Sequence, residues 1–470
     1  MFMPDNSVFV KVEAPNMVPD RTKNERLSME ERLTTFREIE KTYTEEEALR
    51  EASRCMGCPR RWCSGECPAG MPVPEFIKKI REKDYEGAYE LIVSASTLPE
   101  FCSRLCPQEK QCQSDCTRSI RSEAVGIGKL ERFAVEQHYA SGKPEKVAPA
   151  TGKTVAVVGS GPSGLSAAVA LAKLGHSVTV IEAEEHPGGL LRYGIPGMKL
   201  EKDILDRKID SMLQMGIAFQ TGITATADTV KDYDAVVLAV GTGNARSLNM
   251  GGAENAKGIH PAVSYLSGTD TAKDKDVIII GGGDTGNDCV GTAIRQGAKS
   301  ITQIEMLPKV TKPQIIYNPL YEKPREQKFD SSQEEHFHKF LKDPHIYQAT
   351  VKAVQKDAGG NIVSVTAVRL EAGYDENRRL VMTEIPGSEM TLPCGLLVVA
   401  AGFIGPKAET AKAFGVETNA RSNIAAGADY KTNVPKIFAC GDCHTGQSLV
   451  VKAMVDGREC AKAVDVFLKA

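Results

Sequence analysis

Six residues, Gly159-Ser160-Gly161-Pro162-Ser163-Gly164, narrow the possible folds of this chain sharply. They lie between an apolar run, Thr154 to Val158, and a stretch with helical periodicity. Glycines at these positions let the backbone turn tightly and bring the N-terminus of the following helix against a pyrophosphate. Glu182 follows a second apolar run, Ser177 to Ile181, where a carboxylate can accept hydrogen bonds from a ribose. This order predicts a dinucleotide-binding unit; the alternative is a tight turn with only a structural role.

A second glycine-rich turn, Gly281-Gly282-Gly283-Asp284-Thr285-Gly286, follows the apolar run Val277 to Ile280, and its unit ends at Glu305. Two such units predict two bound dinucleotides. Glu305 should repel a 2'-phosphate and suit a free 2'-hydroxyl, although Lys309 and Lys312 follow closely enough to compensate. NADH is therefore favoured over NADPH. The alternative is that Glu305 is a solvent-facing residue at a strand end.

Length and charge limit the remaining possibilities. A chain of 470 residues is expected to form roughly three domains. Its 58 basic and 61 acidic residues are nearly balanced, so we expect no nucleic acid and no anionic membrane as a partner. No apolar stretch approaches the roughly 20 residues that cross a bilayer, and Asp5, Lys11 and Glu13 stand where a signal peptide would be apolar. We therefore expect a cytoplasmic protein.

Periodicity divides the chain into regions. The first 140 residues are expected to be helical, with Thr44 and Glu47 in a capping-box pattern. Breakers and charges in residues 141–149 predict a linker. Alternating strands and helices then predict two parallel sheets, with a hairpin in residues 346–370 and a buried strand in residues 396–401.

Near the C-terminus, Ile437-Phe438-Ala439-Cys440-Gly441-Asp442 resembles the second FAD signature of the disulfide-reductase-like flavoproteins, which have two dinucleotide domains. The resemblance implies that Asp442 binds the ribityl-phosphate region and that a helix starting near Gln447-Ser448 points at the flavin ring. It also implies that the NAD(P)H domain is inserted into the FAD domain.

The disulfide-reductase chemistry itself is not expected. The segment Gly188-Gly189-Leu190-Leu191-Arg192 lacks the cysteine pair that thiol exchange would need there. Cys440 and Cys443 have two-residue spacing, which we interpret as structural packing. Hydride transfer needs no general acid or base, so no catalytic proton-transfer residue is predicted. The predicted FAD and NAD(P)H sites together comprise Gly159, Gly161, Pro162, Ser163, Gly164, Glu182, Gly189, Leu190, Arg192, Gly241, Gly441, Asp442, Gln447, Ser448, Leu449, Gly281, Gly283, Asp284, Thr285, Gly286, Asp288 and Glu305.

Eight of the 13 cysteines crowd into residues 55–116. They form two groups, Cys55-x2-Cys58-x4-Cys63-x3-Cys67-Pro68 and Cys102-x3-Cys106-Pro107-x4-Cys112-x3-Cys116. Tight cysteine groups ending in Cys-Pro are typical of cubane iron-sulfur ligation. Zinc is the alternative, but a two-electron hydride acceptor needs one-electron carriers nearby, and zinc is redox-silent.

The cysteine block followed by a flavoprotein module resembles the small (beta) subunit of glutamate synthase. It is also similar to the N-terminal half of dihydropyrimidine dehydrogenase and to the large subunit of ferredoxin-dependent NADH:NADP transhydrogenase. The segments that carry the resemblance are residues 54–58, 99–107, 127–133 and 446–451. Ligation in this family implies one [4Fe-4S] cluster on Cys55, Cys58, Cys63 and Cys116, and a second on Cys67, Cys106, Cys112 and Glu131. The alternative is that Cys102 is the ligand and Glu131 is an exposed helix charge.

The resemblance implies an α-helical iron-sulfur domain in residues 1–148, followed by α/β structure with two Rossmann-like domains. The FAD domain comprises residues 149–245 and 398–470, and residues 246–397 form the inserted NAD(P)H domain. The implied activity is electron input: hydride passes from NADH or NADPH to FAD, and electrons pass singly through the two clusters. The implied acceptor is a large glutamate synthase subunit that makes L-glutamate from L-glutamine and 2-oxoglutarate. The alternatives are a stand-alone or bifurcating NAD(P)H:ferredoxin or acceptor oxidoreductase, and a non-catalytic zinc-containing redox sensor.

Overall fold

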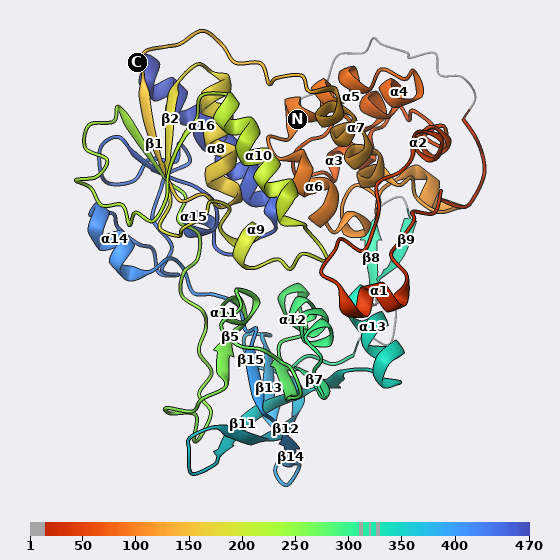
Figure 1. Ribbon diagram of the computed structural model, residues 1–470, viewed down its shortest axis with the longest axis vertical. Helices are drawn as coiled ribbons and strands as arrows, with labels where there is room; N and C mark the ends of the chain where they lie inside the picture. Colours follow the sequence, from red (N-terminus) through yellow and green to blue (C-terminus); the bar gives the residue numbers. More distant parts are fainter. Residues whose placement is uncertain (1–14, 310–313, 319–320, 326–329) are drawn as a thin grey trace.

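The computed structural model describes residues 15–309, 314–318, 321–325 and 330–470, without the side chains of residues 310–329 (Figure 1). Four residues used in the sequence predictions, Asp5, Lys11, Glu13 and Lys312, lie outside the described part. Three regions follow one another along the chain, and each has its own apolar core.

The first region is helical. The capping box at the start of its second helix is confirmed, because Glu47 N donates to Thr44 Oγ1 at 3.3 Å and Thr44 N donates to Glu47 Oε2 at 2.8 Å. Apolar side chains such as Phe76, Ile80 and Phe133 are fully buried between its helices. The helices are α1 (Met29–Thr34), α2 (Glu45–Ala52), α3 (Trp62–Gly65), α4 (Val73–Arg81), α5 (Tyr85–Ala95), α6 (Pro99–Leu105) and α7 (Ile127–Ser141), with two 3-10 turns, η1 (Gln108–Lys110) and η2 (Thr117–Ile120).

The second region is built on a parallel five-stranded sheet with the strand order β16-β4-β1-β2-β3. Alternate residues of β1 enter two cores: Val155 and Val157 pack with α8 and α16, while Ala156 and Val158 pack with α14. The strands are β1 (Thr154–Val158), β2 (Ser177–Ile181), β3 (Ala218–Gln220), β4 (Ala235–Leu238) and β16 (Ile437–Ala439). The helices are α8 (Pro162–Lys173), α9 (Leu190–Tyr193), α10 (Lys202–Gln214), α14 (Ala408–Phe414), α15 (Asp442–Thr445) and α16 (Val450–Lys469).

The third region contains a second parallel sheet, with the order β10-β7-β6-β15-β5. The strand predicted at 277–280 is confirmed as β6, and the strand predicted at 396–401 is β15, which ends at Val399. The elements are β5 (Ile259–Pro261), α11 (Ala262–Leu266), β6 (Asp276–Ile280), α12 (Asp284–Arg295), β7 (Ser300–Glu305), α13 (Ser331–Phe340), β10 (His345–Tyr347) and β15 (Leu396–Val399).

Antiparallel strands complete the third region. The hairpin predicted in residues 346–370 is confirmed as β11 (Ala349–Lys356) and β12 (Ile362–Tyr374). β13 (Leu380–Glu384) and β14 (Met390–Pro393) both pair with β12, and β8 (Gln314–Asn318) pairs with β9 (Tyr321–Arg325). β12 packs against the outer face of the parallel sheet, where Val365 and Ala367 meet Ile278 and Ile280.

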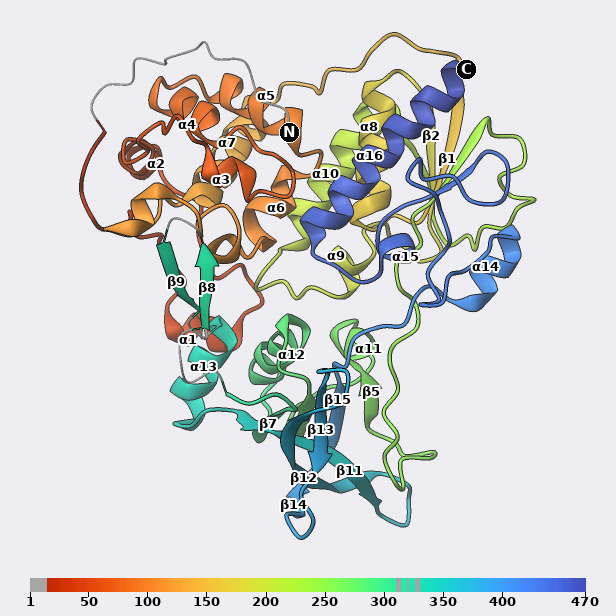
Figure 2. The same ribbon diagram turned by 180° about the vertical axis from the view of Figure 1, so that it is seen from behind.

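Strand order shows how the chain is threaded. β16 lies beside β4 although about 200 residues separate them, so the third region is inserted between two parts of the second. β15 belongs to the inserted sheet, so this sheet extends to Val399, just past the predicted boundary at residue 397. In Figures 1 and 2 the helical region lies beside the first sheet, and the inserted region lies below both.

Candidate functional site

The first glycine-rich turn is tightly packed on one side and open on the other. Gly159 has φ +100°, and a Cβ there would lie 2.5 Å from Ala239 O. A Cβ on Gly164 would lie 2.0 Å from Gly159 O, whereas one on Gly161 would meet no atom within 4 Å. The open side faces the N-terminus of α8, which begins at Pro162. This geometry fits a pyrophosphate held by backbone N–H groups and the helix dipole.

Glu182 stands directly after β2 and organises this turn. Its Oε2 accepts hydrogen bonds from Ser160 N at 2.9 Å and from Ser160 Oγ at 2.5 Å, and its Oε1 accepts one from Glu184 N at 2.9 Å. The Ser160 hydroxyl in turn accepts a hydrogen bond from Gly188 N at 2.8 Å. Sequence reasoning missed Ser160, because nothing in a glycine pattern shows what the residue between the glycines contacts.

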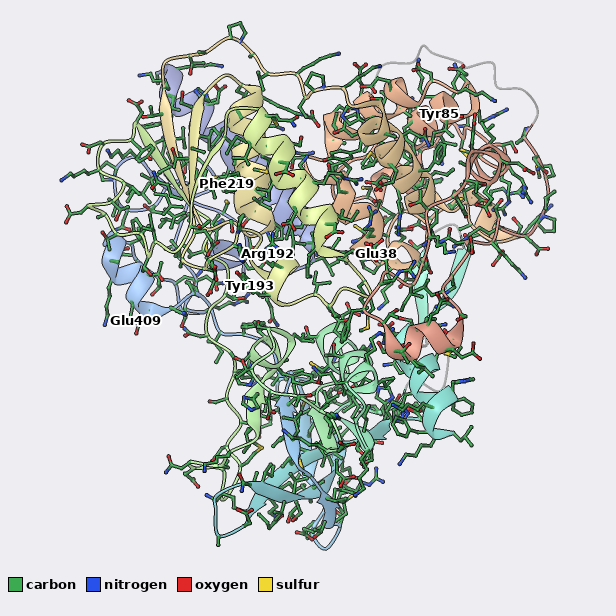
Figure 3. All side chains as sticks on the ribbon, in the orientation of Figure 1. Glu38, Tyr85, Arg192, Tyr193, Phe219 and Glu409 are labelled. Atoms are coloured by element: carbon green, nitrogen blue, oxygen red, sulfur yellow. The ribbon has the colours of Figure 1, made fainter. Side chains whose placement is uncertain are left out.

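Gly189 brings the next loop against the same turn. It has φ +49°, and a Cβ there would lie 2.8 Å from Gly161 Cα. Leu190 and Arg192 lie in α9, and the Arg192 guanidinium donates to Pro187 O and pairs with Asp206 of α10. Figure 3 shows Arg192 and Tyr193 on the side of the second region that faces the inserted one.

The C-terminal signature approaches α8 closely. A Cβ on Gly441 would lie 2.2 Å from Ser163 Oγ, so only glycine lets the chain pass here. Burial raises the pKa of Asp442 to about 6, although Ser448 Oγ donates to its Oδ1 at 2.9 Å. Gly241, in the loop after β4, has φ +62° and open space at its Cβ position. These residues converge on the carboxyl edge of the first sheet, where ligands of such sheets bind.

The helix after this signature starts later than predicted. It was expected near Gln447-Ser448, but α16 begins at Val450 with Leu449 as its N-cap. Gln447 Oε1 accepts from Phe403 N at 2.9 Å, so this side chain binds the loop after β15. Ser448 Oγ donates to Asp442, the first residue of α15.

The second glycine turn repeats the first. Gly281 has φ +117°, a Cβ on Gly286 would lie 2.0 Å from Gly281 O, and Gly283 faces open space. Asp284, Thr285 and Gly286 open α12. Glu305 Oε2 accepts from Gly282 N at 2.8 Å and Oε1 from Leu307 N at 2.7 Å, so it occupies the place that Glu182 has in the first turn.

Asp288 was predicted to belong to the NAD(P)H site, but its side chain pairs with Lys199. It is buried on α12, where Lys199 Nζ lies 2.6 Å from its Oδ1. Burial raises the pKa of Asp288 to about 6, while the Lys199 ammonium opposes that rise. Lys199 belongs to the loop between α9 and α10, so this pair connects the inserted region with the second region.

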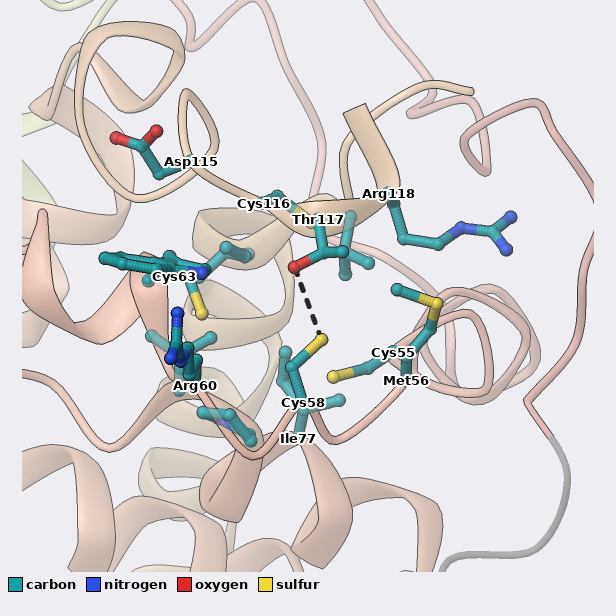
Figure 4. Close-up of a pocket in the computed structure, with 15 residues that line it drawn as sticks. Cys55, Met56, Cys58, Arg60, Cys63, Ile77, Asp115, Cys116, Thr117 and Arg118 are labelled. Carbon is teal, nitrogen blue, oxygen red and sulfur yellow. Dashed lines mark hydrogen bonds between the residues drawn. The ribbon is translucent and has the colours of Figure 1, made fainter. Parts of the chain in front are cut away.

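The first predicted ligand set, called the Cys63 group here, lines one cavity near the surface (Figure 4). Its members are free thiols, and Cys58 Sγ donates to Thr117 Oγ1 at 3.4 Å. Burial raises the pKa of Cys55 to about 11 and that of Cys63 to about 12. A metal binds the thiolate form of cysteine, so cluster binding here would release the protons of these thiols. The lining cysteines are Cys55, Cys58, Cys63 and Cys116, as predicted for one cluster.

The second predicted ligand set, Cys67, Cys106, Cys112 and Glu131, is called the Cys67 group here and contains a buried carboxylate. Glu131 on α7 is buried, and its Oε1 has no hydrogen-bond partner among the described residues. Burial, with the Glu100 charge, raises the pKa of Glu131 to about 8. Burial raises the pKa of Cys67 and Cys112, and the hydrogen bond with Cys102 together with burial raises that of Cys106. The nearby Glu131 carboxylate adds to all three shifts. An unpartnered oxygen among thiols fits the role of a cluster ligand.

Cys102 lies beside the same thiols. Its thiol is hydrogen-bonded with that of Cys106, and this contact raises the pKa of Cys106. Cys102 Sγ also accepts from Ser96 Oγ at 3.8 Å and packs in the apolar core with Leu98. Glu131 is not the exposed helix charge that the alternative required, since it is only 8% exposed. Its buried carboxylate oxygen without a hydrogen bond favours Glu131 over Cys102, which has the Ser96 contact, as the fourth ligand.

Two glycine turns on two parallel sheets, beside a cysteine-rich helical domain, define a class of protein: an NAD(P)H-dependent oxidoreductase with a 4Fe-4S domain. Family models agree with this. Residues 32–143 match dihydropyrimidine dehydrogenase domain II, 4Fe-4S cluster, and residues 153–457 match the pyridine nucleotide-disulphide oxidoreductase family. The zinc alternative for the helical domain is therefore not supported.

Comparison with known proteins defines the family more narrowly. The chain is 37% identical over 467 residues to the small chain of NADPH glutamate synthase from Bacillus subtilis, covering 93% of this chain and 94% of that one. It is 36% identical to the NADH glutamate synthase of Schizosaccharomyces pombe, of which it spans 22%. The chain belongs to the glutamate synthase small-chain family.

A solved structure supports the fold alone. FprA from Mycobacterium tuberculosis has a TM-score of 0.53 and 17% identity, covering 68% of this chain and 85% of that one. Among the helices of the described residues, none is long and apolar enough to cross a membrane.

Proposed function

We propose that this chain is the electron-input subunit of a glutamate synthase. It oxidises NAD(P)H at the Gly281 turn and holds FAD at the Gly159 turn. Two [4Fe-4S] clusters, on the two ligand sets described above, then carry electrons to a large subunit that makes L-glutamate from L-glutamine and 2-oxoglutarate. FAD supplies the step from hydride to single electrons when it is bound. The domain limits predicted from the sequence are part of the proposal, with the second boundary moved to residue 399.

The observation that carries this proposal is the position of the Cys67 group between two apolar cores. Cys67 packs against the apolar core of the first sheet and also against that of the helical domain. Cys106 packs against the first of these cores, whereas Cys112 belongs to the second. This group is therefore adjacent to the proposed FAD domain.

The Cys63 group lies nearer the protein surface. Its cavity is lined by Arg60 and by Trp62, which is 44% exposed. The thiol of Cys63 contributes to raising the pKa of Cys112, so the two groups are neighbours. The proposed order of electron flow is FAD, the Cys67 group, the Cys63 group and then the partner.

Polar contacts fix the helical domain on the proposed FAD domain. Thr97 Oγ1 and Ser166 Oγ on α8 are 2.7 Å apart, and Ser166 Oγ donates to Met454 O of α16 at 2.6 Å. Lys208 Nζ lies 3.1 Å from Glu100 Oε1, with both side chains buried. A fixed docking of this kind suits electron transfer, which depends on constant distances between carriers.

The experiment combines this chain with a glutamate synthase large subunit and measures glutamate formed from glutamine and 2-oxoglutarate with NADH or NADPH. We expect coenzyme-dependent glutamate formation, and about eight iron atoms for each FAD. Cys63→Ser should leave coenzyme-driven flavin bleaching intact and abolish glutamate formation. Reduction of added ferredoxin, with no response to the large subunit, would instead support the stand-alone oxidoreductase.

A further inference from the structure

We propose that the inserted domain selects NADH over NADPH, with Glu305 as the determinant and Lys309 held out of the site. This inference rests on the proposed function, because it names the coenzyme that the Gly281 turn accepts. The relatives named above include both an NADPH and an NADH enzyme at nearly equal identity, so similarity alone does not decide the coenzyme.

Glu305 is rigidly placed beside the turn. Both carboxylate oxygens accept backbone hydrogen bonds, from Gly282 N at 2.8 Å and from Leu307 N at 2.7 Å. The carboxylate is so close that a Cβ on Gly282 would lie 2.2 Å from Oε2. A carboxylate anchored on both sides cannot swing away from an approaching group.

The position of Glu305 is where the adenosine ribose lies in such units. It ends β7, the strand that follows the glycine turn and α12, as the ribose-binding carboxylate does in this arrangement. One lone pair of each oxygen remains for a free 2'-hydroxyl. A 2'-phosphate brings about two negative charges to the same place, and like charges at such short range repel strongly.

Lys309 is the described residue expected to offset that repulsion, and its ammonium points elsewhere. Lys309 Nζ lies 3.2 Å from Asp343 Oδ2 and 5.6 Å from the centroid of the Tyr347 ring. β10 runs parallel to β7, with Tyr347 paired to Glu305 and His345 to Gln303. Asp343 precedes His345, so it lies toward the opposite end of the sheet from Glu305.

Asp343 is itself fixed, which keeps Lys309 directed away from the turn. Its Oδ1 accepts from His345 N at 3.0 Å and lies 2.6 Å from the ring Nδ1 of His345. An exposed ion pair of this kind is weak, so Asp343 is a positioning residue and Glu305 carries most of the selectivity.

The test measures coenzyme binding and flavin bleaching separately on the FAD-loaded chain. We expect NAD+ to bind at least about tenfold more tightly than NADP+ in calorimetry, and the rate of bleaching to favour NADH by a similar factor. Glu305→Gln keeps an acceptor oxygen for the turn but removes the charge, and should reduce the preference by about tenfold or more. Asp343→Asn, which releases Lys309, should reduce it by less than about threefold.

A lysine variant completes the design. In the proposed arrangement Lys309→Gln leaves the NADH to NADPH ratio unchanged. An unmodified chain that binds NADP+ as tightly as NAD+, or a Lys309→Gln variant that loses NADPH alone, would overturn the inference. If neither coenzyme bleaches the flavin, the proposed function itself fails. The Lys309 variant and the unmodified chain remain informative if Glu305→Gln does not fold.

Discussion

At the residue scale, Glu131 shows how burial changes the meaning of a side chain. A glutamate in a helix is usually solvated, and a carboxylate buried without a partner is costly. Here its Oε1 has no hydrogen bond and three thiols lie around it. Such an arrangement is stable if a bound cluster takes the carboxylate as a ligand.

The corresponding prediction separates Glu131 from Cys102. Glu131→Ala should remove the second cluster, so that iron falls from about eight to about four atoms per chain. Cys102→Ala should retain about eight, because it removes a thiol that contacts Cys106 but leaves the four proposed ligands in place, at a cost on the order of 1 kcal/mol of stability. Iron and acid-labile sulfide are measured on both variants after anaerobic purification. Loss of iron in Cys102→Ala with retention in Glu131→Ala would reverse the assignment.

Residue roles could be predicted from the sequence only where a motif fixes the position. Glu182 and Glu305 were expected at the ends of strands, and they lie there. Their hydrogen bonds to Ser160 N and Gly282 N were not foreseen, because a strand-end carboxylate gives no sign of which backbone groups it accepts from. The pairing of Asp288 with Lys199 joins residues far apart in sequence, and no local pattern marks it.

At the element scale, the N-terminus of α8 depends on how closely α16 can approach. A Cβ on Gly457 would lie 2.1 Å from Ser163 O, a backbone atom that cannot shift without moving α8. Gly457→Ala should therefore destabilise the protein by about 1–3 kcal/mol through overpacking and lower the FAD content. Thermal unfolding and flavin absorbance provide the measurements. Gly373→Ala is the matched control, since its Cβ position is open; equal stability of the two variants would contradict this packing.

The linker between the helical domain and β1 contains a glutamate whose side chain is buried. The side chain of Glu145 is 6% exposed, and it accepts from Tyr89 of α5 and pairs with Lys173 of α8 at 2.9 Å. Burial would raise its pKa, but the charges of Lys208 and Lys173 and the two hydrogen bonds outweigh burial and lower it to about 2. The sequence predicted the linker from its breakers and charges, but not that one of those charges is buried.

This lowered pKa predicts how stability depends on pH. An unfolded glutamate titrates near 4.5, so the stabilisation from Glu145 is complete above that pH and is lost as pH falls toward about 2. Glu145→Gln should cost on the order of 2 kcal/mol at pH 7. The difference in unfolding free energy between variant and parent, measured by denaturant titration, should shrink below pH 4.5. A difference that stays constant between pH 7 and pH 3 would exclude this role.

At the scale of the whole molecule, residues 29–38, called the N-terminal segment here, contact all three regions. Glu38 pairs with Arg104 of α6 at 2.9 Å and with Arg132 of α7 at 2.7 Å, and it accepts from Glu201 N near α10 at 3.3 Å. Figure 3 shows Glu38 where the helical region approaches the second. The strand-helix alternation and the cysteine spacing predicted the regions themselves. Their docking could not be predicted, because the ion pairs that join them link residues with no shared local pattern.

The inserted region is held to the N-terminal segment by ion pairs between Arg32 and two carboxylates of α13, the partly exposed Glu334 and the buried Glu335. Glu335 on α13 is fully buried, with Arg32 Nε at 3.0 Å from Oε1 and Arg295 at 2.7 Å from Oε2. Both guanidinium groups are nearly inaccessible to solvent. Removing the Glu335 carboxylate would take the counter-charge from the buried Arg295 and leave Arg32 with the partly exposed Glu334, at 2.9 Å. Breaking a buried ion pair in this way costs about 3–5 kcal/mol. The cost falls on the docking of the inserted region, since Arg32 belongs to α1 and the other residues belong to the inserted region.

Glu335→Ala should therefore open this contact before the whole chain unfolds. We expect limited proteolysis to cut between the N-terminal segment and α2 at least about tenfold faster than in the parent protein, because the open form becomes more populated. Glu409→Gln on the exposed face of α14 is the control and should be cut at the parent rate. If the Glu335 variant resists protease as well as the parent, the docking depends on other contacts. An effect on coenzyme-driven flavin bleaching that follows the cleavage rate would show that hydride transfer requires this closed arrangement.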